Sequence, residues 1–329
     1  MADDTTPTSW RAPMPNLVHR ARMFAVVEIV PVCLAVGGLC VVAGDGVWAL
    51  DVVLFITMYV LTMLGVELGM HRVIAHRQLD AAPSVRAALC IFGAMAGEGS
   101  PLLWSAIHRL HHASPDGGAD PHSPTFNRVG LASRVRGALW SQFLWYADIP
   151  GILGFRRALR ARMERRTRTP DAQAEGFVDI VRDWLDDDLT TWIERRYSLW
   201  IGLGFALPAA LGAVSGGLDG GLHGLVWGGF VRHVAVQQVS FAVNSVGHTL
   251  GARSLATSDQ SRNNIVMAIL TLGAGWHNNH HAFPGAASLS FRWWQLDPCG
   301  MVIRALEAIG LATNVHRADP ARLATRENR

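Results

Sequence analysis

The sequence predicts an all-α integral membrane protein with four transmembrane helices, arranged as two hairpins, and a cytosolic helical cap. Half of the 329 residues are apolar, and 17% are charged, against about 25% in soluble domains. Four apolar stretches are long enough to cross a bilayer, which takes about 20 residues. Histidines gather in clusters beside these stretches, which places a polar, metal-binding type of site next to the membrane.

The predicted spans form two pairs with short connections. Spans 23–43 and 47–70 are separated only by Gly44-Asp45-Gly46, and spans 199–214 and 222–247 by a glycine-rich turn, Ser215 to Gly221. Short glycine-containing connections favour antiparallel neighbours. We therefore expect two hairpins.

The remaining segments are polar and hold nearly all the arginine. They are an N-terminal tail (1–22) and the two parts of the cap (71–198 and 249–312), and we treat 23–329 as a single membrane domain. The excess of arginine on this side predicts that it is cytoplasmic. We expect both termini and the site on the cytoplasmic side of a multi-pass protein, in the plasma membrane if the source is bacterial. The apolar stretch 83–97 is short for a span and is expected to be interfacial or re-entrant.

Composition excludes several function classes. The chain has no lysine, which rules out Schiff-base chemistry through that residue, and its net charge of +3 does not indicate nucleic-acid binding. Its four cysteines form no C-x-x-C pair. Disulfide frameworks, thiolate zinc sites and iron–sulfur clusters are therefore disfavoured.

Nine of the fourteen histidines lie in three clusters and one separate position. Neutral imidazole nitrogen suits iron, copper and zinc, so the clustering indicates transition-metal binding rather than satisfied polar residues at a membrane interface. The nine are His71, His76, His108, His111, His112, His248, His277, His280 and His281.

Helical spacing predicts how these side chains group. Residues at i, i+3 and i+4 share a helix face, so the cluster from His108 to His112 should point one way, as should 277–281 if it is helical. His71 and His76 are five residues apart, about 140° on an α-helix. They either reach different metals or have a break between them.

Nine imidazoles exceed the roughly four to six ligands of one site, which favours two metals. Asn244, four residues before His248, is a plausible water-mediated ligand. Zinc hydrolysis is a weaker alternative because catalytic zinc needs three protein ligands and the chain has no H-E-x-x-H. The Glu-x-x-His pattern of soluble di-iron bundles is also missing.

Carboxylates near the clusters are candidates for orienting the rings. Glu67 lies one turn before His71, and Asp116 and Asp120 follow the second cluster. Each could hydrogen-bond a metal-binding imidazole, the alternative being a cap or a surface salt bridge. We expect His122 to brace the structure rather than to bind metal.

The set H-x4-H, H-x2-H-H, N-x3-H and H-x2-H-H-x-F-P resembles the membrane acyl-CoA desaturase family, of the stearoyl-CoA Δ9 type and its bacterial relatives. Flanking residues add to the resemblance, which covers roughly residues 25–312. They are Trp104, Asp120-Pro121-His122, Asn244-Ser245, Phe283-Pro284 and Arg292-Trp293-Trp294.

The resemblance implies a mushroom-like membrane fold in which the nine histidines bind two iron ions and Asn244 contacts one of them through water. It implies a reaction that uses O2 and two electrons to place a cis double bond, expected at Δ9, in a saturated fatty acyl chain. An acyl hydroxylase or an acetylenase on the same scaffold is the alternative. A histidine-lined metal transporter is disfavoured because the clusters lie at one membrane face.

The resemblance also suggests residues for the acyl chain. Trp104 is similar to a tryptophan that shapes the bend of the substrate tunnel. Ser240 stands where a threonine is common, and Glu98 where a glutamine is common. A partly buried carboxyl at Glu98 would contact the substrate, a bound water or a metal-binding side chain. The alternative is a glutamate that is exposed in a glycine-rich loop.

The sequence predicts the carrier of the acyl chain less clearly. Two positions that are charged in animal relatives are Ala106 and Ile107 here. The chain attached to coenzyme A, to acyl-carrier protein or to a phospholipid therefore remains an alternative. Arg156 and Arg157 begin an arginine-rich run, 156–168, that we interpret as an anion site for the head. The alternatives are a surface facing solvent or lipid head groups, and a dock for an acidic electron-transfer partner.

The electrons must come from another protein. The chain has no Rossmann fingerprint, no His-Pro-Gly-Gly haem motif and no ferredoxin cysteine pattern. We expect an external donor, either a ferredoxin or an NAD(P)H-dependent reductase with an iron–sulfur centre. The other expected partners are the lipid bilayer and the fatty acyl thioester, and no nucleic acid.

Overall fold

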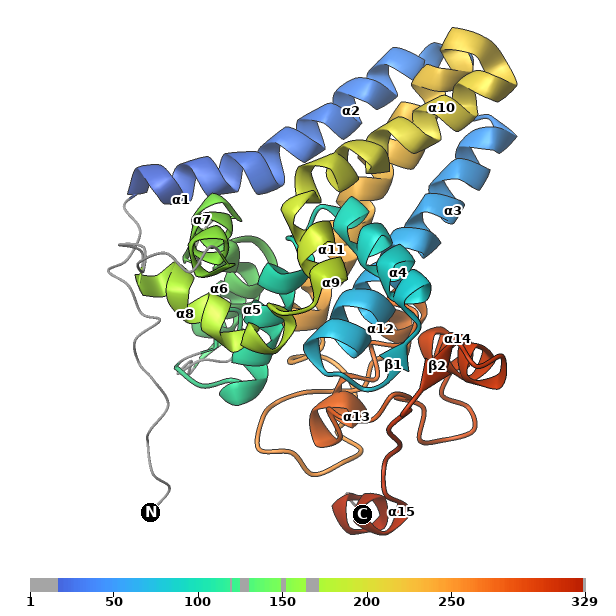
Figure 1. The fold of residues 1–329 in the computed structure, drawn as a ribbon. Coiled ribbons are helices and arrows are strands. Elements are labelled where there is room, and N and C mark those ends of the chain that lie inside the picture. Colours follow the sequence, from blue (N-terminus) through green and yellow to red (C-terminus); the bar gives the residue numbers. More distant parts are fainter. Residues whose placement is uncertain (1–16, 119, 125–129, 149–151, 164–171, 328–329) are drawn as a thin grey trace.

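The computed structural model describes residues 17–118, 120–124, 130–148, 152–163 and 172–327, and this part of the chain is mostly helical, as predicted. Long helices project from one end of a body of shorter helices that carries the C-terminal segments (Figure 1). One pair of two-residue strands, β1 (Asp80–Ala81) and β2 (Ala312–Thr313), is antiparallel. The α-helices are α1 (Leu17–Phe24), α2 (Val30–Val42), α3 (Ala49–Leu64), α4 (Pro83–Ala96), α5 (Pro101–Ala113), α6 (Leu131–Phe143), α7 (Ile152–Met163), α8 (Ala172–Ile180), α9 (Asp188–Arg195), α10 (Tyr197–Gly224), α11 (Arg232–Ser245), α12 (Ile265–Leu270), α13 (His277–Ala282), α14 (Pro298–Ala308) and α15 (Pro320–Arg326).

Three helical runs are long and apolar enough to cross a membrane: Leu17–Asp45, Ala49–Ala75 and Tyr197–Ser245. In the first and third runs a π-helical segment joins two α-helices, and in the second run a π-helical segment continues α3. Large apolar side chains lie exposed along them, for example Val36 at 55% and Val53 at 58%. Such exposure is costly in water and favourable in lipid. The chain is therefore a membrane protein.

Two helical runs extend beyond the predicted spans. The first helix begins at Leu17 rather than at Met23, so part of the expected tail is helical, and residues 1–16 lie outside the described part. The second run continues past residue 70 to Ala75 because π-helical winding carries the helix through the first histidine. Apolar content alone marks where lipid contact ends, and a helix can continue beyond that point into the protein.

The third run reverses direction inside α10. Gly216 and Gly217 leave helical geometry, and Gly217 has a φ of +62°, a conformation that glycine adopts without steric cost. On either side of this turn the backbones pack closely: a Cβ on Gly212 would lie 2.0 Å from the carbonyl oxygen of Gly220. The predicted hairpin is therefore present, but its turn is shorter than the expected 215–221.

The apolar stretch 83–97 forms α4, and α5 follows after a bend of 82°. Both helices begin with proline, whose missing N–H has no partner to lose in the first turn. At the start of α5, Glu194 accepts a hydrogen bond from the Leu102 N–H at 2.9 Å, which satisfies an amide that the helix leaves free. The bend and this contact orient α5, which carries the second histidine cluster.

Several polar side chains inside the long helices form hydrogen-bonded pairs. The His223 Nδ1–H donates to the Asp51 carboxylate at 3.0–3.1 Å, and the ring of His223 stacks on Trp48 at 3.9 Å. In the first run, Glu28 accepts a hydrogen bond of 2.8 Å from Gln238. Polar groups cost much free energy in lipid unless they are paired. These contacts join the first hairpin to the second.

A buried ion pair ties the end of the second run to the C-terminal segments. The Arg72 guanidinium donates to both carboxylate oxygens of Asp297, at 3.0 and 2.8 Å, and to the Ala287 carbonyl at 2.6 Å. Asp297 also accepts from the backbone N–H groups of Leu289 and Gly300. Because Arg72 follows His71 directly, this pair fixes the helix that presents the first histidine cluster.

Replacing Asp297 with asparagine should destabilise the protein by roughly 3–5 kcal/mol, because Arg72 would stay buried without its counter-charge. The matched control is Glu307→Gln, which breaks the exposed Arg317–Glu307 pair and should cost about 0–1 kcal/mol. Thermal unfolding of the purified protein measures both. An Asp297→Asn midpoint equal to that of the control would contradict the assignment.

The Arg72–Asp297 pair also predicts that the protein loses folding stability at low pH. Burial raises the pKa of Asp297, but the charge of Arg72 and the hydrogen bonds outweigh it and hold the pKa below its ordinary value. The stabilisation is therefore complete above the unfolded pKa, about 3.9, and is lost as pH falls through the folded value. The free energy of unfolding of Asp297→Asn should therefore vary less with pH below about 3.9 than that of the wild-type protein.

Candidate metal centre

The first histidine pair lies on a π-helical segment, Gly65–Ala75. The His76 N–H donates to the His71 carbonyl at 3.0 Å, the i to i+5 bond that defines a π turn. The wider turn brings residues five apart toward one face, and the rings of His71 and His76 lie 5.0 Å apart. Of the two alternatives, different metals for the two rings is contradicted, because both belong to one set; the helix changes its winding between them instead.

The other histidines come from three further segments. α5 carries the second cluster, and the turn after α11 carries His248. α13 carries the third cluster, and this segment is helical. Segments more than two hundred residues apart in sequence thus meet, and all nine clustered histidines gather in one place.

The nine rings divide into two sets. Within each set of four, one ring nitrogen per residue lies within 4.8 Å of the others. His112 joins the first set, since its Nε2 lies 2.8 Å from the Nε2 of His280. With His112 included, the first set is His71, His76, His108, His112 and His280, and the second is His111, His248, His277 and His281.

The second and third clusters are both split between the sets, which contradicts the prediction that each cluster points one way. His108 and His112 face the first set, whereas His111 faces the second. On α13, His280 belongs to the first set and the other two histidines to the second. Residues at i, i+3 and i+4 share a face only approximately, so α5 and α13 each serve both sets.

The Nε2 atoms converge at metal-ligand spacing. Those of His71 and His280 lie 3.1 Å apart, and those of His248 and His277 lie 3.0 Å apart. Two nitrogens bound at right angles to one metal at about 2.1 Å would lie about 3.0 Å apart. Facing lone pairs repel one another unless a cation lies between them. The donor set therefore fits two metal ions and is compatible with a di-iron centre.

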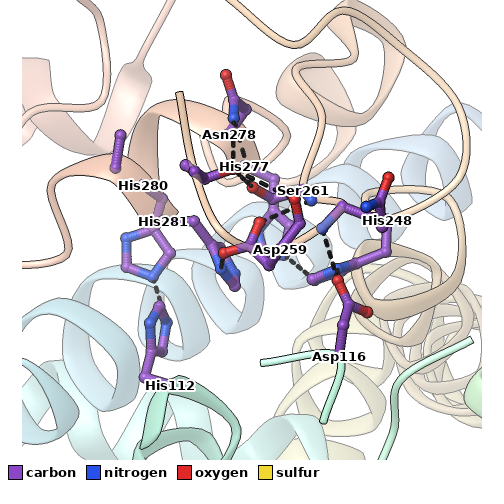
Figure 2. A network of polar contacts seen from close by, with 12 residues as sticks. His112, Asp116, His248, Asp259, Ser261, His277, Asn278, His280 and His281 are labelled. Atoms are coloured by element: carbon purple, nitrogen blue, oxygen red, sulfur yellow. Dashed lines mark hydrogen bonds and ion pairs between the residues drawn. The ribbon is translucent and has the colours of Figure 1, made fainter. Parts of the chain in front are cut away.

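The opposite ring nitrogens are held by carboxylates. The Nδ1–H groups donate to Glu67 from His71 at 3.0 Å, to Asp120 from His111 at 2.8 Å, to Asp116 from His248 at 3.1 Å and to Asp259 from His281 at 2.9 Å. Figure 2 shows the last two contacts together with the His112–His280 approach. Such partners fix the tautomer and direct Nε2 toward the metal.

The roles expected for Glu67, Asp116 and Asp120 agree with this geometry, whereas Asp259 was missed. Asp259 lies in a polar loop far in sequence from every cluster, so spacing gave no signal for it. His122 lies beside His111, with ring centroids 4.5 Å apart, and the backbone N–H of His122 donates to the Asp120 carboxylate. Both contacts fit its expected bracing role.

The third cluster is uncharged, as metal binding requires. Burial, together with the neighbouring imidazoles, lowers the pKa values of His277, His280 and His281 well below the ordinary value of histidine. The rings therefore keep their lone pairs at neutral pH.

A cavity adjoins both sets. Trp104, Ser240, Glu98 and Asn244, the residues expected to contact substrate or water, line it together with histidines from each set. Trp104 also stacks on His108 at 5.0 Å. Trp145 and Phe241 complete the wall and were not singled out from the sequence, because aromatic residues in an apolar stretch carry no specific signal.

The two arginines expected to bind the substrate head lie outside this cavity. Arg156 donates to the Ser198 hydroxyl and to the Arg195 carbonyl, and Arg157 is exposed. Residues 164–168 of the run are outside the described part. The anion site stays a prediction.

Comparison with known proteins gives a family. The model of the fatty acid desaturase family matches residues 46–314. The chain is 31% identical to a hex-5-enoyl-[acyl-carrier protein] acetylenase of Moorena producens (strain JHB), over 90% of this chain and 86% of that protein. It is 31% identical to an sn-1 stearoyl-lipid 9-desaturase of Anabaena variabilis, over 83% and 86%, and 32% identical to an icosanoyl-CoA 5-desaturase of Limnanthes douglasii, over 77% and 61%. With its histidine sets, carboxylates and adjoining cavity, the chain belongs to the fatty acid desaturase family and is an oxidoreductase of lipid metabolism.

Proposed function

We propose that the protein is an O2-dependent fatty acyl desaturase that introduces a cis double bond at Δ9 into a saturated acyl chain. The observation that carries the proposal is the pair of histidine sets, whose Nε2 atoms converge while carboxylates hold their Nδ1 atoms. The sn-1 stearoyl-lipid 9-desaturase among the relatives supports the bond position.

Two iron ions, one in each set, would supply the O2-dependent oxidising power needed to break an unactivated C–H bond. The nine histidines would hold them, with Asn244 contacting one ion through water. The residues of the chain itself position the substrate. The apolar wall that includes Ile107, Phe241 and Val243 excludes water and holds a methylene pair beside the histidines.

We further propose that the chain crosses the membrane four times, because the Gly216–Gly217 reversal makes two arms of the third run. Residues 23–329 would form one domain. Arginine in the cap and tails supports a cytoplasmic position for both termini and the metal centre. Electrons would come from a separate ferredoxin or reductase, and the substrate would be a fatty acyl thioester such as acyl-CoA, with Arg156 and Arg157 near its head.

An acetylenase acting on a carrier-protein-linked chain is the second candidate. The acetylenase relative aligns over 90% of this chain, and the same oxidation applied to an alkene gives a triple bond.

Replacing one histidine of either set with alanine should lower the iron content and abolish turnover. Elemental analysis of wild-type protein should find about two irons per chain, and His280→Ala and His281→Ala should each lose one or more. His316→Ala, outside both sets, is the control and should keep them. Wild-type iron content in both set variants would refute the centre.

Replacing Asp259 with asparagine should weaken metal retention without abolishing it, because the His281 ring loses only its orienting acceptor. Loss of such a partner typically costs about 10–100-fold in metal affinity. Competition with a chelator measures this, and exposed Asp186→Asn serves as the control. Equal retention in the two variants would show that Asp259 does not support the metal.

Expression in a host that lacks its own desaturase, followed by lipid analysis, tests the reaction itself. We expect a cis-monounsaturated chain that depends on O2 and on a reductant. A triple-bonded product from an alkenoyl substrate would select the acetylenase, and a hydroxylated product the hydroxylase. Membranes that contain iron-loaded protein and a reductant but form none of these products would contradict the proposal.

A further inference from the structure

The C-terminal segment 318–327 contacts two of the segments that support the second histidine set. It lies beyond residue 314, where the match to the desaturase family ends. Its helix α15 follows Asp319, whose carboxylate accepts a hydrogen bond of 2.9 Å from the Ala321 N–H, and begins with Pro320. A capping aspartate and a proline in the first position are local signals that start a helix. Figure 1 shows α15 at the end of the body away from the long helices.

The first contact is with the loop that carries Asp259. The loop contains no helix, so it has few backbone hydrogen bonds of its own. The Ala256 N–H donates to the Arg326 carbonyl at 2.7 Å. A second support comes from Asn278 on α13, whose side chain bonds the N–H and the carbonyl of Leu255 at 2.8 and 3.1 Å. The position of the loop therefore depends on contacts from other segments.

The second contact is with the end of α13. The Arg326 guanidinium donates to the Ala282 carbonyl at 2.9 Å and lies over the Phe283 ring, 5.5 Å from its centre. Ala282 is the last residue of α13, so its carbonyl has no hydrogen-bond partner inside the helix. Leu323 packs on the apolar cluster that contains both residues and Leu255. One short helix therefore holds the loop and the end of α13 together.

These two segments meet at one hydrogen bond of the second set. The His281 Nδ1–H donates to the Asp259 carboxylate at 2.9 Å (Figure 2). The His281 Nε2 lies 3.2 Å from the Nε2 of His111. A partner of this kind directs the opposite ring nitrogen toward the metal, and a hydrogen bond is lost beyond about 3.5 Å. A shift of the loop by about 1 Å relative to α13 would therefore release the ring.

We propose that the C-terminal segment 318–327 is a clamp for the metal centre, in which Arg326 is a positioning residue that acts through Asp259 and His281. The clamp sets how tightly the second set retains its metal. It affects the first set less, because there the carboxylate that orients a ring is Glu67, from another segment. This inference rests on the proposed metal centre and adds a supporting part of the chain outside the family match.

The test titrates iron-loaded full-length variants with a chelator. Arg326→Ala should lower the affinity for about one iron per chain by several-fold, less than the about 10–100-fold expected when an outer partner itself is removed. Arg326→Lys keeps the charge and a donor, and it should restore much of the retention. Arg322→Ala is the matched control, because Arg322 is exposed on the same helix, and it should retain iron as the wild-type protein does.

Hydrogen exchange of the metal-free protein measures the clamp without the metal. The amides of residues 255–259 should exchange several-fold faster in Arg326→Ala, and in Leu323→Ala, than in Arg322→Ala. Equal exchange and equal iron retention in Arg326→Ala and Arg322→Ala would overturn the inference. So would loss of both irons together with a lower unfolding midpoint, because the segment would then support only overall stability. Wild-type protein that holds no iron would instead refute the proposed centre, while the exchange measurement would still decide whether the segment positions the loop.

Discussion

The rest of the structure depends on one constraint: nine imidazoles must present their lone pairs toward two points inside a buried site. Nitrogens 2.8–3.2 Å apart repel one another without a cation between them. Neutral rings also lose hydration when they are buried. Contacts outside the site offset this cost by holding two of the contributing segments in place. The Arg72–Asp297 pair holds the segment of the first cluster, and the Glu194 contact holds α5.

The sequence predicted the mostly helical class, the membrane setting and the histidines that gather in two sets. These predictions agree with the structure because they rest on local signals: the length of apolar stretches and the clustering of histidines along the chain. Glu67 was found because it lies one turn from His71, and Asp120 because it lies shortly after the second cluster. A partner within about ten residues is restricted to few positions, so sequence proximity is informative there.

The features that the sequence did not predict depend on geometry that leaves no local signal in the sequence. The π-helical winding that unites His71 and His76 inserts one residue into a turn, and no residue type marks it. The division of α5 between the two sets depends on the direction in which that helix crosses the others. Asp259 reaches His281 only because a loop folds back over α13, so nothing in its own neighbourhood indicated a role. These features follow from tertiary packing.

The outer carboxylates also settle the electrostatics of the proposed centre. Two divalent irons would bring four positive charges into a site whose imidazoles are neutral. Glu67, Asp116, Asp120 and Asp259 place carboxyl groups one ring away from the metal positions, where they offset part of that charge. The Arg72–Asp297 pair adds no net charge. This compensation lowers the cost of holding two cations in a low-dielectric site next to the membrane.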